Sequence, residues 1–195
     1  LMSHSSREAS TFSAACRLVY RSADHAVTAD EAWELAGAVE DWSRVVALAE
    51  GAMATSALWR LVHAHALPLV PADAAEYLRK SATVSEFRMR HLSSRLAATL
   101  REFRAREVPV MLLKGAAVGA MTDPTFVARP MTDLDLLVGR ASLPQARESV
   151  LAAGWPETRD PVLLALLQDQ HHVPPFVDPQ ISDFRLELHV SLFPP

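Results

Sequence analysis

The sequence predicts an α/β (α+β) protein in which a helical N-terminal region precedes a mixed sheet flanked by helices. Three observations support this fold class. Most of the chain before residue 108 is alanine-rich and repeats apolar residues at helical spacing. Short apolar or alternating runs with the length of strands then follow, and a further helical pattern lies between the second and the third of them. We therefore expect a helical region at 1–70, a long connecting helix at 71–107 and a sheet-containing core at 108–195.

Four helices are expected before the first strand, because these segments lack proline and place apolar residues at helical spacing. The longest contains neither glycine nor proline and carries an apolar stripe of Leu92, Leu96, Leu100 and Phe103. Pro71 lies where this long helix is expected to begin. The four expected helices are 6–20, 30–51, 53–66 and 72–107.

The first strand is expected at 108–113, an almost unbroken apolar run that is typical of a strand covered on both faces. Lys114 and Gly115 end it. Glycine lets the backbone approach a ligand closely, and Gly115 also opens an expected helix whose N-terminal N–H groups favour phosphate. This pattern indicates half of a nucleotide site, although Lys114 and Gly115 by themselves would form only a turn.

The second strand is expected at 132–138. Strand geometry sends Asp133 and Asp135 to one face and the leucines between and after them to the other. Two carboxylates on one face can hold Mg²⁺, which takes oxygen ligands and keeps substrate phosphates in its shell. Taken alone, the two aspartates would be solvated residues at the rim of a strand.

The last strand is expected at 184–190, where Arg185, Glu187 and His189 alternate with apolar residues that face the core. If this strand lies beside 132–138, Glu187 becomes a third carboxylate of the same pocket. An ordinary exposed strand face is the alternative. His171, His172 and His189 could suggest zinc, but adjacent histidines diverge and no cysteine accompanies them, which favours satisfied or loop histidines.

The connections between these strands are also predictable. The segment 142–153 should form a helix that ends at Gly154, the usual residue past a helix C-terminus. A further helix is expected at 161–170, and a proline-containing loop at 171–182.

The order of strand, glycine turn, helix and D-x-D strand resembles the nucleotidyltransferase fold of the polymerase β superfamily. More narrowly, the sequence is similar to the uncharacterised bacterial nucleotidyltransferases. The similarity lies in three segments in this order: LLKGAAVGAM, RPMTDLDLLV and a strand with E-L-H. The resemblance covers roughly residues 108–190. It implies Asp133, Asp135 and Glu187 as catalytic and metal-binding residues, and its nucleotide-binding residues are Lys114, Gly115 and Arg129.

Two features of this resemblance leave alternatives open. The superfamily usually follows its glycine with serine, whereas this chain has Ala116, and Lys114 then substitutes as a point charge. Arg129 would offset charge on the phosphates or simply pair with Asp123 or Glu157.

The activity that the resemblance implies is transfer of a nucleoside monophosphate from a nucleoside triphosphate (NTP) to an unidentified acceptor hydroxyl, with Mg²⁺ or Mn²⁺ and release of pyrophosphate. The acceptor would be a small molecule, a peptide or a protein, and less readily RNA. RNA is considered because the long helix is rich in arginine, with Arg88, Arg95 and Arg106 near one line, although a solvated helix face is the simpler interpretation. The alternatives are a non-catalytic binding or antitoxin-like module and a tailoring enzyme for a peptide natural product.

Composition narrows the setting. The net charge of −4 implies no general attraction to nucleic acid. A single cysteine, Cys16, excludes an internal disulfide and fits a reducing cytoplasm. No stretch approaches the roughly 20 apolar residues of a membrane helix, so we expect a cytoplasmic protein without a membrane segment. Because Leu1 precedes Met2 and the chain stops directly after an expected strand, we expect a fragment of a longer polypeptide.

Overall fold

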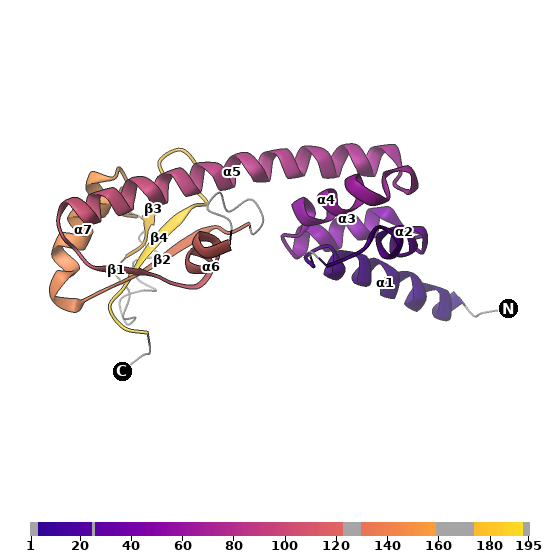
Figure 1. Ribbon diagram of the computed structural model, residues 1–195, viewed down its shortest axis with the longest axis horizontal. Helices are drawn as coiled ribbons and strands as arrows, with labels where there is room; N and C mark the ends of the chain where they lie inside the picture. The colour runs from indigo at the N-terminus through magenta and orange to yellow at the C-terminus, as the bar shows by residue number, and fades with distance from the viewer. Residues whose placement is uncertain (1–3, 25, 123–129, 159–173, 193–195) are drawn as a thin grey trace. The chain divides into compact units, whose positions relative to one another are not determined.

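The computed structural model describes residues 4–24, 26–122, 130–158 and 174–192 (Figure 1). The chain divides into two compact units, Leu1–Arg88 and Met89–Pro195, and each has a hydrophobic core of its own. Both parts of the predicted fold class are present, a helical N-terminal region and a mixed sheet with interleaved helices. No helix among the described residues has the length and apolar character needed to cross a membrane.

The first unit consists of short helices around a small apolar core. Leu18, Val45, Leu58 and Leu78 are fully buried there. The helices are α1 (His4–Arg21), α2 (Ala29–Gly37), α3 (Trp42–Gly51), α4 (Thr55–His65) and the 3₁₀ turn η1 (Leu67–Leu69).

The single helix expected at 30–51 is wrong, because the chain forms α2 and α3 with a break between them. Asp41 has an extended backbone, with φ −127°, and its carboxylate accepts a hydrogen bond from the Arg44 N–H at 3.2 Å. An aspartate in this position is a strong N-cap, since it satisfies a backbone donor that the first turn leaves unpaired. Apolar spacing carries across the break and therefore does not reveal it.

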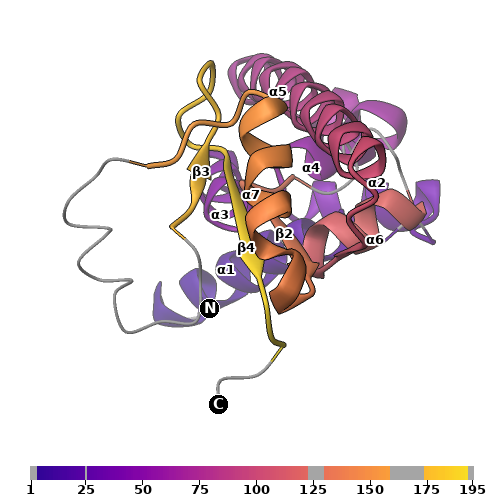
Figure 2. The same cartoon turned by 90° about the vertical axis from the view of Figure 1, so that its left-hand side faces the viewer.

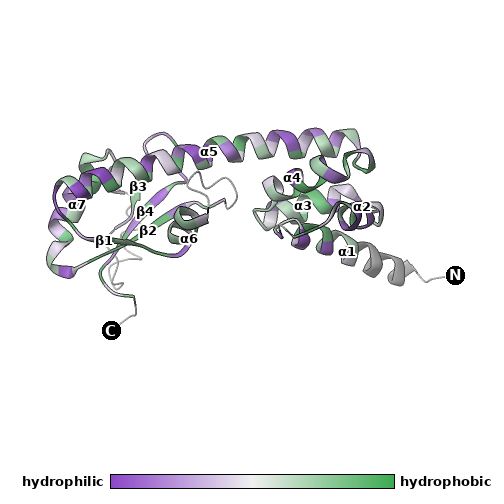
Figure 3. Ribbon diagram, in the orientation of Figure 1, coloured by the Kyte–Doolittle hydropathy of each residue, from purple (hydrophilic) through white to green (hydrophobic). Residues whose placement is uncertain are grey.

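The long helix α5 (Ala72–Ala105) is confirmed and contributes apolar residues to both cores. Leu78 belongs to the core of the first unit, whereas Leu92, Leu96 and Phe103 belong to that of the second. Figure 3 shows hydrophobic and hydrophilic bands alternating along this helix, as expected when a helix buries one face.

The second unit is built on a four-stranded mixed sheet in the order β1-β2-β4-β3. Strands β1 and β2 pair antiparallel, β2 and β4 pair parallel, and β3 and β4 pair antiparallel. The strands are β1 (Val110–Leu112), β2 (Asp133–Val138), β3 (Phe176–Val177) and β4 (Arg185–His189). The helices are α6 (Lys114–Thr122), the 3₁₀ turn η2 (Arg140–Ser142) and α7 (Leu143–Ala152).

Two expectations about this sheet are corrected. The first strand is not covered on both faces: β1 is an edge strand, and the side chain of Met111 is 58% exposed. The loop expected at 171–182 contains the short strand β3, which pairs with β4 at the other edge. The helix expected at 161–170 lies outside the described residues.

The sheet has one apolar and one polar face. Leu134 and Leu136 of β2 and Leu186 and Leu188 of β4 are fully buried in the core of the unit, to which α5 and α7 also contribute. Figure 2 shows α7 and the two central strands from the side. Because side chains alternate along a strand, the acidic residues of β2 and β4 share the opposite face.

Candidate metal and nucleotide site

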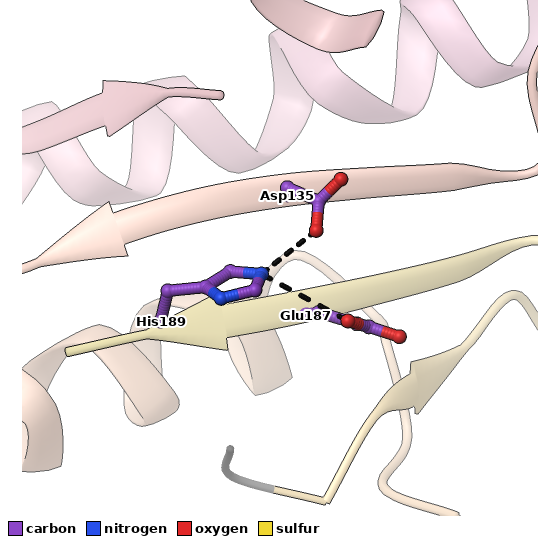
Figure 4. Close-up of side chains that lie close together, drawn as sticks. All are labelled: Asp135, Glu187 and His189. Carbon is purple, nitrogen blue, oxygen red and sulfur yellow. Dashed lines mark hydrogen bonds and ion pairs between the residues drawn. The ribbon is translucent and has the colours of Figure 1, made fainter. Parts of the chain in front are cut away.

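The parallel pairing of β2 with β4 builds an acidic site on the polar face of the sheet. The pairing places Asp135 directly beside Glu187, with His189 two residues further along the same strand. One ligand atom from each of these three side chains lies within 4.8 Å of the others. Figure 4 shows the three side chains directed toward one another from the two strands.

Asp135 is the centre of this group. Its carboxylate is 2% exposed, and its Oδ1 lies 2.7 Å from Nε2 of His189. The same imidazole nitrogen lies 3.8 Å from Oε2 of Glu187, whose side chain is 31% exposed. The group therefore runs from a buried carboxylate to one that solvent can reach.

Lys114 brings a positive charge from the turn between β1 and α6. Its Nζ donates to Oδ1 of Asp135 at 2.7 Å, and the Leu113 N–H donates to the Asp135 carbonyl oxygen at 2.9 Å. The hydrogen bond to Asp135 is the main cause that raises the pKa of Lys114 above its ordinary value, against the effect of burial and with smaller contributions from Glu187 and Asp133. The ammonium is thus charged at neutral pH.

The backbone of this turn is unusual. Lys114 has φ 46°, a left-handed conformation that costs a side-chain-bearing residue on the order of 1 kcal/mol. This conformation places Lys114 as the first residue of α6, so the helix starts directly at the acidic site. Strained backbone of this kind is common at ligand sites, where the surrounding structure holds it in place.

Gly115 and Ala116 differ in what their side-chain positions meet. A Cβ added to Gly115 would lie 3.5 Å from Sδ of Met131, which is an ordinary contact, so packing alone does not require a glycine. Ala116, where the superfamily usually has serine, is 1% exposed and belongs to the core. Lys114 is therefore the residue of this turn that supplies a polar side chain to the site.

The other predicted site residues have different positions. Asp133 lies on the same strand face as Asp135, but it is exposed, and its register partner on β4 is Arg185. Arg129 and Asp123 lie outside the described residues. Glu157, one alternative partner for Arg129, forms an ion pair with Arg147.

His189 is the residue that the sequence interpretation left out of the site. The alternation of β4 places it on the same face as Glu187, whereas the sequence pattern by itself favours a satisfied or loop histidine. The signal that could have identified it is its i, i+2 spacing from Glu187 on a strand next to the D-x-D strand.

The arginine-rich face expected on the long helix is interrupted at Arg95. Its guanidinium donates to the carbonyl oxygens of Ala153 and Gly154, both at 2.9 Å, and lies over the ring of Trp155. Its Nε is also 2.8 Å from Oδ2 of the buried Asp178. Arg95 therefore holds the second unit together and is not part of a solvated basic stripe.

The donor atoms of the acidic site fit a divalent cation. Two carboxylates and an imidazole nitrogen from adjacent strands are ligand types that divalent ions accept, with bond lengths of about 2.0 to 2.2 Å. The buried Asp135 carboxylate accepts a hydrogen bond from the Lys114 ammonium, as expected for an anion that needs positive charge nearby, and it also lies against the imidazole of His189. Asp133 lies on the same face as a further carboxylate.

Comparisons with known proteins extend the resemblance beyond the motifs. The model of a protein family described as "Uncharacterised nucleotidyltransferase" matches residues 38–195. The matched segment includes the whole sheet and much of the helical region before it. No curated protein and no solved structure matches the chain.

Proposed function

Because the chain belongs to the uncharacterised nucleotidyltransferase family, we propose that it transfers a nucleoside monophosphate from an NTP to an acceptor hydroxyl and releases pyrophosphate. The observation that carries this proposal is the side-by-side position of Asp135 and Glu187, with the Lys114 ammonium bound to Asp135. Such a site combines a place for a divalent cation with a positive charge for phosphate at the start of a helix.

Asp135 and Glu187 would hold Mg²⁺ or Mn²⁺, with Asp133 as a further carboxylate on the same face. The bound cation would offset charge on the triphosphate and lower the pKa of the acceptor hydroxyl. Lys114 would contact the phosphates as a mobile point charge, and Gly115 would let them approach the first N–H groups of α6. Arg129, which precedes β2, is proposed as a second cationic contact to the phosphates.

In the proposed reaction, the acceptor oxygen forms a new bond to the α-phosphorus. The bond from this phosphorus to the oxygen that bridges to the β-phosphorus breaks, and pyrophosphate leaves with that electron pair. Glu187 takes up the proton of the acceptor hydroxyl, because its side chain is more exposed than those of Asp135 and His189. Lys114 and Arg129 offset the charge that develops on the leaving group.

The acceptor is proposed to be a small molecule, a peptide or a protein. RNA is the weaker choice because the net charge is −4 and Arg95 is engaged within the fold. A second candidate function is a non-catalytic binding module that keeps the fold. The observation in its favour is that Ala116, at the usual serine position, is a buried core residue without a hydroxyl.

Labelled nucleotides test the proposed reaction. The protein is incubated with a cell extract, Mg²⁺ or Mn²⁺ and each NTP carrying ³²P at either the α or the γ position. With the wild type, we expect the α label to enter an acceptor and the γ label to leave as pyrophosphate. With the variant Asp135→Asn, we expect neither incorporation of the α label nor release of labelled pyrophosphate. Transfer of the γ label would indicate phosphoryl transfer instead. Absence of transfer with every NTP, despite metal-dependent binding of NTP, would favour the binding module.

A further inference from the structure

We propose that His189 is a direct metal ligand of this site and that it makes the site prefer a first-row transition metal ion, such as Mn²⁺, over Mg²⁺. The inference deepens the proposed function and rests on it, because the residues concerned belong to the proposed metal and nucleotide site. It concerns which cation the site selects, and it assigns a role to a residue outside the predicted carboxylate set.

The first step is the position of the imidazole. His189 is 6% exposed, and its Nε2 points at the two carboxylates, 2.7 Å from Asp135 Oδ1 and 3.8 Å from Glu187 Oε2. Two ligands of one ion with bonds of about 2.0 to 2.2 Å are separated by at most about 4.4 Å. The three donor atoms lie within 4.8 Å of one another, so small side-chain rotations suffice to place one ion among them.

The second step is that the sheet holds this nitrogen in place. His189 is on β4, and its register partner on β2 is Leu137, so its backbone position is fixed by the same parallel pairing that places Glu187 beside Asp135. A ligand on a paired strand is positioned more accurately than one on a loop. A cation bound by Asp135 and Glu187 would therefore lie within reach of Nε2.

The third step is the chemistry of the ligand set. Mg²⁺ takes oxygen ligands in a strict octahedral arrangement and gives up its waters reluctantly. Transition metal ions bind N/O sites in an order of affinity that rises from Mn²⁺ toward Cu²⁺. Imidazole suits the later ions of this series best, but even Mn²⁺ takes a nitrogen ligand more readily than Mg²⁺ does. One buried imidazole beside two carboxylates therefore shifts the preference away from Mg²⁺.

Direct spectroscopy of the protein loaded with Mn²⁺ alone tests this inference. Pulsed electron paramagnetic resonance detects nitrogen nuclei bound to Mn²⁺, and we expect coupling to an imidazole nitrogen in the wild type. Incorporation of ¹⁵N-histidine should change the coupling pattern. The variant His189→Gln should lose the coupling, while the control His63→Gln, which changes an exposed histidine on α4 in the other unit, should keep it.

Affinities provide a second readout. Equilibrium dialysis with Mn²⁺, and with Mg²⁺ as competitor, gives the ratio of the two dissociation constants. We expect His189→Gln to weaken Mn²⁺ binding by about tenfold or more and to change Mg²⁺ binding much less, so that the preference largely disappears. A histidine that merely donated a hydrogen bond to Asp135 would weaken both ions alike.

The outcomes separate this inference from the proposed function. Wild-type protein that binds Mn²⁺ without nitrogen coupling would overturn the role of His189 and leave the nucleotidyltransferase proposal intact. Protein that binds no divalent cation, with or without NTP, would contradict the proposed function itself. If thermal melting shows that His189→Gln does not fold, His189→Asn takes its place, and the spectrum of the ¹⁵N-labelled wild type still decides whether histidine is a ligand.

Discussion

At the scale of single residues, the two aspartates of β2 share a face but have different surroundings. Asp133 is exposed, whereas Asp135 is 2% exposed, accepts a hydrogen bond from Lys114 and has Nε2 of His189 2.7 Å from its Oδ1. Burial makes Asp135 the carboxylate with the greater cost of desolvation and the greater need for positive charge nearby. Replacement of Asp135 and replacement of Asp133 should therefore differ in their effect on metal-dependent NTP binding.

Replacing Asp135 by asparagine should abolish metal-dependent NTP binding, while Asp133→Asn should weaken it only in part. The free energy of unfolding of Asp135→Asn should change by less than about 1 kcal/mol, because the lost ion pair is offset by the relief of a buried charge and Lys114 is 62% exposed. Calorimetric NTP titration and urea unfolding measure the two effects. A loss of stability of about 3 kcal/mol or more would show that this carboxylate has mainly a structural role.

Gly115→Ala separates the needs of a ligand from those of the fold. The added Cβ would meet Met131 Sδ at an ordinary 3.5 Å, so the melting temperature should be unchanged or slightly higher, since alanine favours a helix. NTP affinity should nevertheless fall by about tenfold, because the methyl group occupies space that the phosphates approach.

Gly139→Ala is the matched control for that variant. Its added Cβ would lie 3.8 Å from Ser142 Oγ, away from the acidic site. It should leave both melting temperature and NTP affinity unchanged. If Gly115→Ala binds NTP as tightly as this control does, the phosphates do not approach Gly115.

The sequence identifies the carboxylates of the site well, but it does not predict how deeply each of them is buried. Period-two alternation put Asp133 and Asp135 on one face, and the structure agrees. Alternation does not predict that Asp133 is exposed and Asp135 is buried. The burial of Asp135 depends on the turn that brings Lys114 beside it. The sequence also does not show that His189 contacts Asp135, because the two residues are 54 positions apart in the chain.

At the scale of elements, a buried ionic cluster fixes α5 to the segment between β3 and β4. The Asp178 carboxylate is fully buried and accepts from the N–H groups of Gln180 and Ile181 at 2.9 and 2.8 Å. On α5, His91 Nε2 and Arg95 Nε approach the same carboxylate at 3.1 and 2.8 Å. This cluster holds the turn that leads into β4, the strand of Glu187 and His189.

Burial alone would raise the pKa of Asp178, but hydrogen bonds from Ile181 and Gln180 and the neighbouring His91 together hold the pKa below its ordinary value of 3.8. A lowered pKa in the folded state means that the stabilisation is fully present above the ordinary value. It is lost as the pH falls through the lower folded value.

Asp178→Asn should therefore lower the free energy of unfolding by about 3 kcal/mol at neutral pH, because Arg95 loses its buried partner. The difference from wild type should shrink as the pH falls below about 4. Urea unfolding of both proteins across this range measures it. A difference that stays constant with pH would mean that the charge of Asp178 does not contribute to stability.

Most elements of the second unit can be predicted from local sequence, but the edges of its sheet cannot. Continuous patterns of many residues predict β2 and the long helix α5, which runs through the division between the two units. Strand β3 has two residues, too few for any pattern, and it forms only because β4 provides a pairing edge. The exposure of β1 likewise depends on its place at the end of the sheet order.

At the scale of the whole molecule, the family match and the topology point to the same part of the chain. The matched segment 38–195 contains the whole sheet, including the strands β2 and β4 and the turn at Lys114 that together form the acidic site. The mixed sheet could be predicted from the order of the motifs, because that order resembles a known fold. The division into units at Arg88 and Met89 falls within α5, so the predicted domains at 1–70, 71–107 and 108–195 stay a prediction.

The most direct measurement concerns whether β2 and β4 together form one metal-dependent nucleotide site. A non-hydrolysable NTP analogue is titrated calorimetrically into wild type, Glu187→Gln and the control Glu148→Gln, which changes an exposed glutamate on α7. Each titration is made with Mn²⁺ and with chelator. The wild type and the control should bind at least about tenfold more tightly with Mn²⁺, and Glu187→Gln should lose most of that gain. Equal affinity with and without the ion in the wild type, or an undiminished gain in Glu187→Gln, would contradict a shared site built by Asp135 and Glu187.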